Sequence, residues 1–163
     1  PGETVNVLET PQHIVSGCIK WRAGLMYERH DSVARVLHYA YCLKYGLTPT
    51  LWRLPVPSFM QNEKARIWWN TKLDTVNPID HCVPDIAVFD DEEKRIYVIE
   101  VSVAWHSSIS ESERRKTRKY CVNSMLPDSY AGPTLAGRNL VSELRTTHNY
   151  DVVFVPVVIG ACG

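Results

Sequence analysis

Two acidic residues, Asp85 and Glu100, stand in stretches that are otherwise apolar. Asp85 follows Pro84, and fourteen residues separate it from Glu100, which lies inside the β-branched run from Arg95 to Ala104. Burying a carboxylate is costly unless a partner compensates it. If neighbouring strands bring the two acids together, a divalent cation between them removes their repulsion. Mg²⁺ takes one or two carboxylates and completes its octahedron with water and phosphate oxygen. The pattern therefore predicts a metal site able to activate water against a phosphodiester.

The hydrophobic pattern predicts the elements that position these acids. Residues 85–89 and 95–104 form two strands joined by the acidic stretch 90–93, as in a hairpin, and the second strand is expected to be buried on both faces. Upstream, alternation over 65–76 favours another strand, after an irregular, proline-containing stretch. A helix is expected over 27–45, ending before Gly46, with an apolar face of Val33, Val36, Leu37, Ala40 and Tyr41.

Three further elements are expected after the second acid. Residues 110–124 form a polar helix that starts at a capping box of Ser110 and Glu113. A short helix over 140–145 precedes a last apolar strand over 151–159. The alternation of helices and strands predicts an α/β domain with a mixed central β-sheet flanked by helices.

Composition narrows the class of protein. A chain of 163 residues with 45% hydrophobic and 22% charged residues suits one globular domain. No apolar run approaches the length of a membrane span, and the first residues do not resemble a signal peptide. Five scattered cysteines favour reduced thiols in an intracellular protein. The net charge of zero counts mildly against nucleic-acid binding, but residues 114–119 carry five positive charges in six positions, which indicates a local basic face.

A Pro-Asp turn followed by an acid in a strand resembles the signature of PD-(D/E)xK nucleases. The lysine usually found two residues after the second acid is replaced here by Ser102. Lys116 and Lys119, in the next predicted helix, are the candidates to supply that charge from elsewhere. Pro-Asp is also a common turn dipeptide, and an acid in a strand can simply lie at a sheet edge.

Several separated stretches strengthen the resemblance. In order and over nearly the whole chain, they are similar to the C-terminal restriction-like endonuclease domain of site-specific non-LTR retrotransposon proteins. The similar stretches are Glu9 to Cys18, Arg29 to Ala34, Pro84 to Ile86, Val98 to Val103, Lys116 to Tyr120, and Val155 to Gly160.

The resemblance implies a restriction-endonuclease-like fold and an enzyme that nicks target DNA in the nucleus, where the new end primes a reverse transcriptase in the same polyprotein. By position, Asp85 and Glu100, with Val101, are expected at Mg²⁺ or Mn²⁺. Lys116 becomes the displaced catalytic lysine, and Tyr120 lies one helical turn away on the same face. The DNA-binding residues are expected to be Arg29 and His30 in the first helix and Arg114, Arg118 and Lys119 in the basic run, with Lys119 pointing away from the site toward phosphate.

The same family carries a CCHC zinc knuckle before the nuclease domain. His13 and Cys18 match its second half, but residues 1–12 contain no cysteine, and two ligands do not close a zinc site. Residues 1–20 are therefore expected to be a linker and a knuckle remnant, and 21–163 the endonuclease domain. Zn²⁺ is expected only where an upstream knuckle completes the site. The other histidines, among them His81, show no ligand spacing.

Three alternatives remain open at this point. The domain could keep the fold as a nuclease-dead binding or scaffolding module. It could be a structure-selective enzyme resembling Holliday-junction resolvases. It could also position DNA for the reverse transcriptase and cleave slowly.

Overall fold

The structure, a computed structural model, describes residue 24 and residues 27–121 and 138–160. Their elements follow in the order α2 (Tyr27–Lys44), β1 (Phe59–Gln61), β2 (Ala65–Trp69), β3 (Ile86–Asp90), β4 (Arg95–Ala104), the 3₁₀ helix η3 (His106–Ser108), α3 (Ile109–Cys121), α4 (Leu140–His148) and β5 (Asp151–Gly160). The five strands form one sheet in sequence order, antiparallel except for the parallel pair of β4 and β5. The predicted α/β class and mixed sheet are confirmed.

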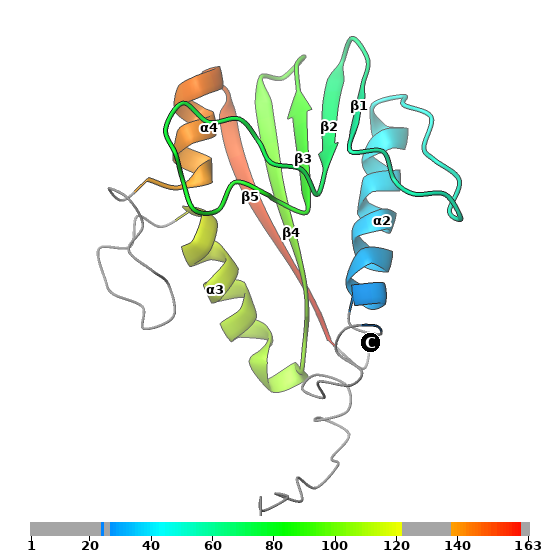
Figure 1. The fold of residues 1–163 in the computed structure, drawn as a ribbon, viewed down its shortest axis with the longest axis vertical. Coiled ribbons are helices and arrows are strands. Elements are labelled where there is room, and N and C mark those ends of the chain that lie inside the picture. Colours follow the sequence, from blue (N-terminus) through cyan, green and yellow to red (C-terminus); the bar gives the residue numbers. More distant parts are fainter. Residues whose placement is uncertain (1–23, 25–26, 122–137, 161–163) are drawn as a thin grey trace, which may run out of the picture.

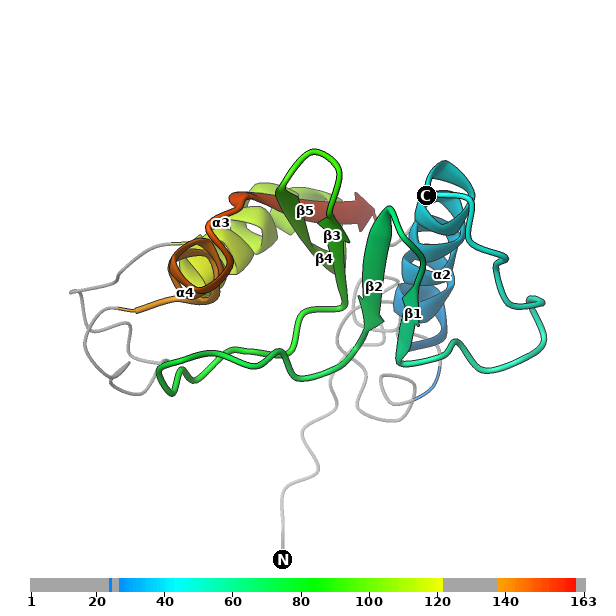
Figure 2. The same ribbon diagram turned by 90° about the horizontal axis from the view of Figure 1, so that it is seen from above.

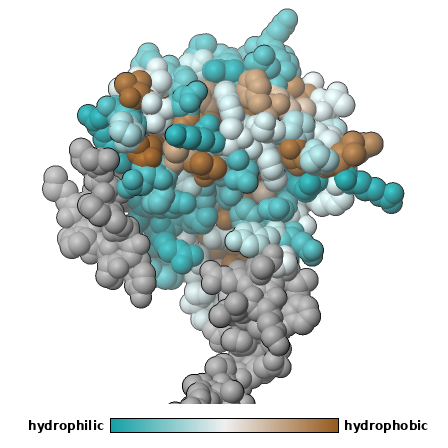
Figure 3. Space-filling view, viewed as in Figure 1, coloured by the Kyte–Doolittle hydropathy of each residue, from teal (hydrophilic) through white to brown (hydrophobic). Residues whose placement is uncertain are grey.

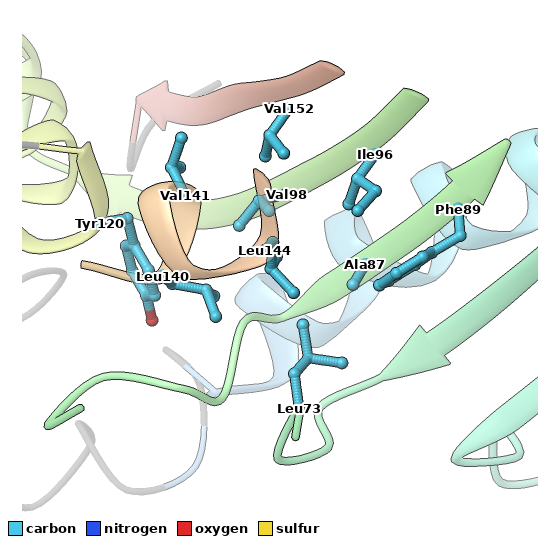
Figure 4. Packing of buried hydrophobic residues seen from close by; sticks show 10 residues of the cluster. All are labelled: Leu73, Ala87, Phe89, Ile96, Val98, Tyr120, Leu140, Val141, Leu144 and Val152. Atoms are coloured by element: carbon cyan, nitrogen blue, oxygen red, sulfur yellow. The ribbon is translucent and has the colours of Figure 1, made fainter. Parts of the chain in front are cut away.

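Helices cover both faces of this sheet, with α2 on one side and α3 and α4 on the other (Figures 1 and 2). Strand alternation divides the core accordingly. Ile86, Val88, Ile99 and Val101 pack with α2. The residues between them along the strands pack with α3 and α4, in the cluster of Leu73, Ala87, Phe89, Ile96, Val98, Tyr120, Leu140, Val141, Leu144 and Val152 (Figure 4).

The predicted hairpin of β3 and β4 is present. Its register runs from Ile86 opposite Ile99 to Asp90 opposite Arg95. The acidic stretch makes the turn, in which the Asp90 carboxylate accepts from the Glu93 N–H at 2.9 Å and Lys94 takes a positive φ of 54°. Every residue of β3 is buried. The hairpin therefore forms the rigid centre of the sheet.

The predicted strand over 65–76 was too long. β2 ends at Trp69 because Asn70 takes a left-handed φ of 42°, and its N–H leaves the ladder to donate to the Asp85 carbonyl at 2.9 Å. The apolar alternation of the sequence extends beyond Trp69 because Leu73, which lies outside any strand, also packs in the core. The short edge strand β1, just after the prolines, was missed.

The expected apolar face of α2 was partly correct, because Val33, Leu37 and Tyr41 pack against the core. Val36 is 57% exposed and Ala40 is also exposed, whereas the buried residues are Ala34, His38 and Cys42. His38 is tolerated inside because its ring meets Trp69 edge-on, with centroids 5.5 Å apart, and because burial lowers its pKa toward the neutral form. A polar residue type at the centre of the buried face misled the pattern.

The helix after β4 begins differently from the prediction. α3 starts at Ile109, directly after η3, so Ser110 lies inside the helix and the expected capping box is wrong. A capping box occurs instead at α4, where Asn139 accepts from the Ser142 N–H at 2.9 Å. α4 runs three residues beyond the predicted end at 145, to the left-handed Asn149. The predicted end of the earlier helix at 124 lies outside the described residues.

The surface of the described part of the chain is mostly hydrophilic on one face (Figure 3). On the face drawn in Figure 3, hydrophilic residues predominate, and apolar ones are scattered between them. None of the described helices combines the length and hydropathy needed to cross a lipid bilayer.

Candidate active site

Asp85 lies immediately before β3, at the point where β4 continues without a strand partner on its β3 side. Its Oδ2 accepts the backbone N–H of Val101 at 2.7 Å, so the side chain replaces the missing strand partner. The same oxygen accepts from Nε2 of His30, on α2, at 3.1 Å. Burial alone would raise the pKa of Asp85, but these hydrogen bonds outweigh it and hold the pKa below its usual value. The carboxylate is therefore ionised.

Glu100 lies on the side of the sheet that α3 covers. If the register of the hairpin is continued by one position beyond the pair of Ile86 and Ile99, Asp85 is the neighbour of Glu100 across the two chain segments. Glu100 is only 2% exposed, and Nζ of Lys116 contacts its Oε2 at 2.5 Å. The Lys116 charge also helps to lower the pKa of Asp85. The two acids and Lys116 thus form one electrostatic cluster.

Tyr120 lies on the same face of α3 as Lys116, as predicted. Its ring packs in the core and is 1% exposed, while its hydroxyl lies at the edge of the hydrophobic cluster (Figure 4). The hydroxyl donates to the carbonyl of Val83 at 3.2 Å. Burial raises the pKa of Tyr120, and the negative charge of Glu100 adds to the shift, so the phenol stays protonated. Tyr120 therefore ties α3 to the segment that leads into Asp85.

His30 connects α2 to the site. Besides Asp85, its ring contacts Asp31 through Nδ1 at 3.1 Å. The hydrogen bond to Asp85 is the main reason that the pKa of His30 is raised to about 9, against the opposing effect of burial. His30 is therefore a cation in this arrangement. Arg29, its neighbour on α2, has an exposed side chain.

The donor set can be tested against a divalent cation. Among the described residues there is no group of three or more His, Cys, Asp or Glu side chains that could hold a metal ion. The carboxylates of Asp85 and Glu100 are oxygen donors of the kind that Mg²⁺ and Mn²⁺ take, with water completing the coordination. Both described hydrogen bonds to Asp85 fall on Oδ2. Because a strand residue directs its N–H and C=O to the same edge, the Val101 carbonyl faces this end of β3 as well.

The basic run divides between two faces of α3. Arg114 and Arg118 are exposed and line one shallow surface depression of about 350 Å³ together with Ser110, Glu113 and Thr117. Arg114 also pairs with Glu111 at 3.2 Å. Lys119 instead lies near the acids, half-buried, with Nζ 4.7 Å from the centre of the Tyr120 ring. The three residues do not form a single patch.

His81 is a neighbour of the site that spacing along the sequence did not reveal. Its ring centroid lies 6.3 Å from that of Tyr120. Burial lowers the pKa of His81, and the Lys119 charge lowers it further. No periodic pattern of the sequence could place His81 near the site, because it lies in the irregular segment 70–85, which brings it next to α3. His13, Cys18 and the expected boundary at residue 20 lie outside the described residues.

The geometry thus brings together Asp85, Glu100, Lys116 and Tyr120, adds His30 from α2, and leaves Arg114 and Arg118 on a separate surface. Comparison of the chain with protein-family models, with curated proteins and with solved structures found no match.

Proposed function

We propose that this domain is a Mg²⁺- or Mn²⁺-dependent DNA endonuclease with a restriction-endonuclease-like fold, which nicks target DNA so that the reverse transcriptase of a retrotransposon can prime on the new end. The observation that carries the proposal is the contact of Lys116 with Glu100, in a cluster that also contains Asp85. Two acids and a lysine are the residue types that such nucleases use, and here one acid lies just before β3 and the other in the adjacent β4. Here the lysine comes from α3, and Ser102 occupies the usual position.

Each side chain has a distinct task in this proposal. Asp85 and Glu100 would hold the cation, which when bound would supply a Lewis acid and lower the pKa of water. Lys116 places a fixed positive charge where negative charge develops on the phosphate, and fixed cations stabilise such charge efficiently in a dry site. Tyr120 keeps the segment before Asp85 in place through Val83. His30 orients Asp85 from the other layer.

The experiment compares the parent with Asp85→Asn, which keeps the shape of the side chain and removes its charge. Nicking of supercoiled plasmid is measured in Mg²⁺, and duplex binding is measured in Ca²⁺. We expect at least about a hundredfold slower nicking with binding nearly intact, because the removed charge acts on the reacting phosphate through the cation. Asp151→Asn is the matched control, since Asp151 is exposed and pairs with Arg95 away from the site.

Equal nicking by Asp85→Asn and the parent would reject the proposal. If neither nicks with any divalent cation, also within the longer polyprotein, while both bind duplex DNA, the domain is a binding or scaffolding module. Faster cleavage of four-way junctions than of plain duplex would instead identify a structure-selective nuclease.

A further inference from the structure

Lys119 is a half-buried cation beside the site that takes no part in its ion pairs. Asp85 is matched by His30, and Glu100 by Lys116. Within the part of the chain that the structure describes, no carboxylate lies within the 4.0 Å of an ion pair to Lys119. The side chain rests instead against the face of the Tyr120 ring. Lys119 is therefore a cation of this cluster that has no ion-pair partner in the described part of the chain.

An unmatched, partly desolvated charge is costly, and such groups are more common at functional sites than in plain structural positions. Burial lowers the pKa of Lys119, and the attraction of Glu100 opposes that shift without cancelling it. An anion from outside the domain would compensate the ammonium group.

Lys119 shares a small depression with His81 and Arg138, next to the first residues of α4. Its volume of about 10 Å³ admits roughly one oxygen atom. His81 can offer a ring N–H there in its neutral form. Arg138 is half-exposed and only loosely paired, with Nε 3.9 Å from Glu143. Asp80 is exposed and also borders the depression, so charges of both signs line it.

We propose that Lys119 and His81, with Arg138 at the border, form a phosphate subsite that takes one non-bridging oxygen of the DNA phosphate next to the scissile one. Identifying the phosphate as part of DNA rests on the proposed function, whereas phosphate binding itself does not. Lys119 follows Lys116 by three positions on α3, so the two side chains leave neighbouring positions of the helix surface. A single DNA strand could then place two successive phosphates against Lys116 and Lys119.

The first test uses inorganic phosphate as the probe. The imidazole signals of His81 are followed by NMR at constant pH and ionic strength in the parent, in Lys119→Gln and in Lys64→Gln. We expect a saturable shift in the parent and an apparent Kd about tenfold weaker in Lys119→Gln, the size of one charge-assisted hydrogen bond. Lys64→Gln is the matched control, because it removes an exposed ammonium group that lies beside Glu92, away from the site. An unmoved His81 signal, or equal weakening by both variants, would overturn the subsite.

The second test uses DNA duplexes that each carry one neutral methylphosphonate, with binding measured in Ca²⁺. The parent should bind less tightly when the phosphate next to the scissile position is neutralised. Lys119→Gln should bind this neutralised duplex and the unmodified duplex with equal affinity, because the group that contacts the phosphate is already missing. Additive losses at every position would contradict the assignment. A parent that shows the His81 response without nicking refutes the endonuclease alone, whereas nicking without that response refutes the subsite alone.

Discussion

The ammonium group of Lys116 contacts Glu100 across two elements, with Nζ 2.5 Å from Oε2. Glu100 lies in the middle of β4, and Lys116 lies near the middle of α3. The position on β4 that would carry a lysine in the usual nuclease signature is the buried Ser102. The helix thus brings a positive charge to the strand from outside it.

We expect Lys116→Ala to slow Mg²⁺-dependent nicking by roughly a hundredfold or more while duplex binding in Ca²⁺ stays nearly unchanged, because a charge aimed at the reacting phosphate is removed. Lys64→Ala is the control, since Lys64 pairs loosely with Glu92 on the exposed hairpin end. If Lys116→Ala nicks at the parent rate, Lys119 or a metal-only mechanism has to replace this assignment.

The same ion pair predicts a stability effect that needs no activity. Without divalent cation, Lys116→Ala should lower the free energy of unfolding by about 2–3 kcal/mol, because it leaves the buried Glu100 carboxylate unpaired. Adding Glu100→Gln should recover most of that loss. Mg²⁺ should stabilise Lys116→Ala more than the double variant, and equal stabilisation of both by Mg²⁺ would contradict Glu100 as a metal ligand. Denaturant unfolding measures each value.

Tyr120→Phe separates the ring from the hydroxyl. The ring keeps its place in the core, but the hydrogen bond to the Val83 carbonyl is removed, so we expect about 1 kcal/mol of destabilisation. Nicking should slow less than in Lys116→Ala, because the hydroxyl positions the segment before Asp85. A loss of nicking as large as that of Lys116→Ala would assign the hydroxyl a direct role in the reaction.

The outer face of α3 should govern salt dependence. In the double variant Arg114→Gln, Arg118→Gln, the slope of the logarithm of DNA affinity against the logarithm of salt concentration should fall by about 2, one unit for each phosphate that the protein no longer neutralises. Arg95→Gln is the control, because Arg95 pairs with Glu93 and Asp151. An unchanged slope in the double variant places the DNA elsewhere on the domain.

Asp91 gives a pH-dependent prediction. Arg66 donates to both of its carboxylate oxygens, at 2.8 and 2.7 Å, and Tyr150 adds a third hydrogen bond at 2.9 Å. The hydrogen bonds from Arg66 are the main reason that the pKa of Asp91 is lowered, and burial opposes them. The folded carboxylate therefore binds a proton less readily than the unfolded one, so its contribution is present above the ordinary value of 3.8 and is lost as the pH falls below it.

Asp91→Asn should accordingly cost about 1–2 kcal/mol of unfolding free energy at pH 7. The difference from the parent should shrink as the pH falls below about 4. The exposed Asp151→Asn should show little change across the same range. A constant difference between Asp91→Asn and the parent at all pH values would refute the role of the Arg66 pair.

Patterns of hydrophobic residues were sufficient for the centre of the sheet. The β3 and β4 hairpin followed from two buried runs around an acidic turn, because buried strands leave few alternatives. The buried face of α2 could not be predicted from the hydrophobic pattern, since it contains His38, whose burial depends on the contact with Trp69 in β2. The early end of β2 did not follow either, because Asn70 turns the chain to meet Asp85.

The site divides in the same way. Lys116 and Tyr120 could be placed on one face from helical spacing alone. The same spacing led to the expectation that Lys119 points away, but its long side chain folds over the Tyr120 ring toward the acids. His81 could not be placed, because an irregular segment carries it and no periodicity applies there.

The β3 and β4 hairpin has a consequence for how the molecule folds. The contacts of Asp85 with Val101 and of Lys116 with Glu100 each span 16 positions of sequence, whereas that of Tyr120 with Val83 spans 37 and that of His30 with Asp85 spans 55. Short loops close at a lower entropic cost and form faster. The acids and the lysine can therefore assemble from one continuous stretch of chain before α2 docks, and His30 completes the arrangement last.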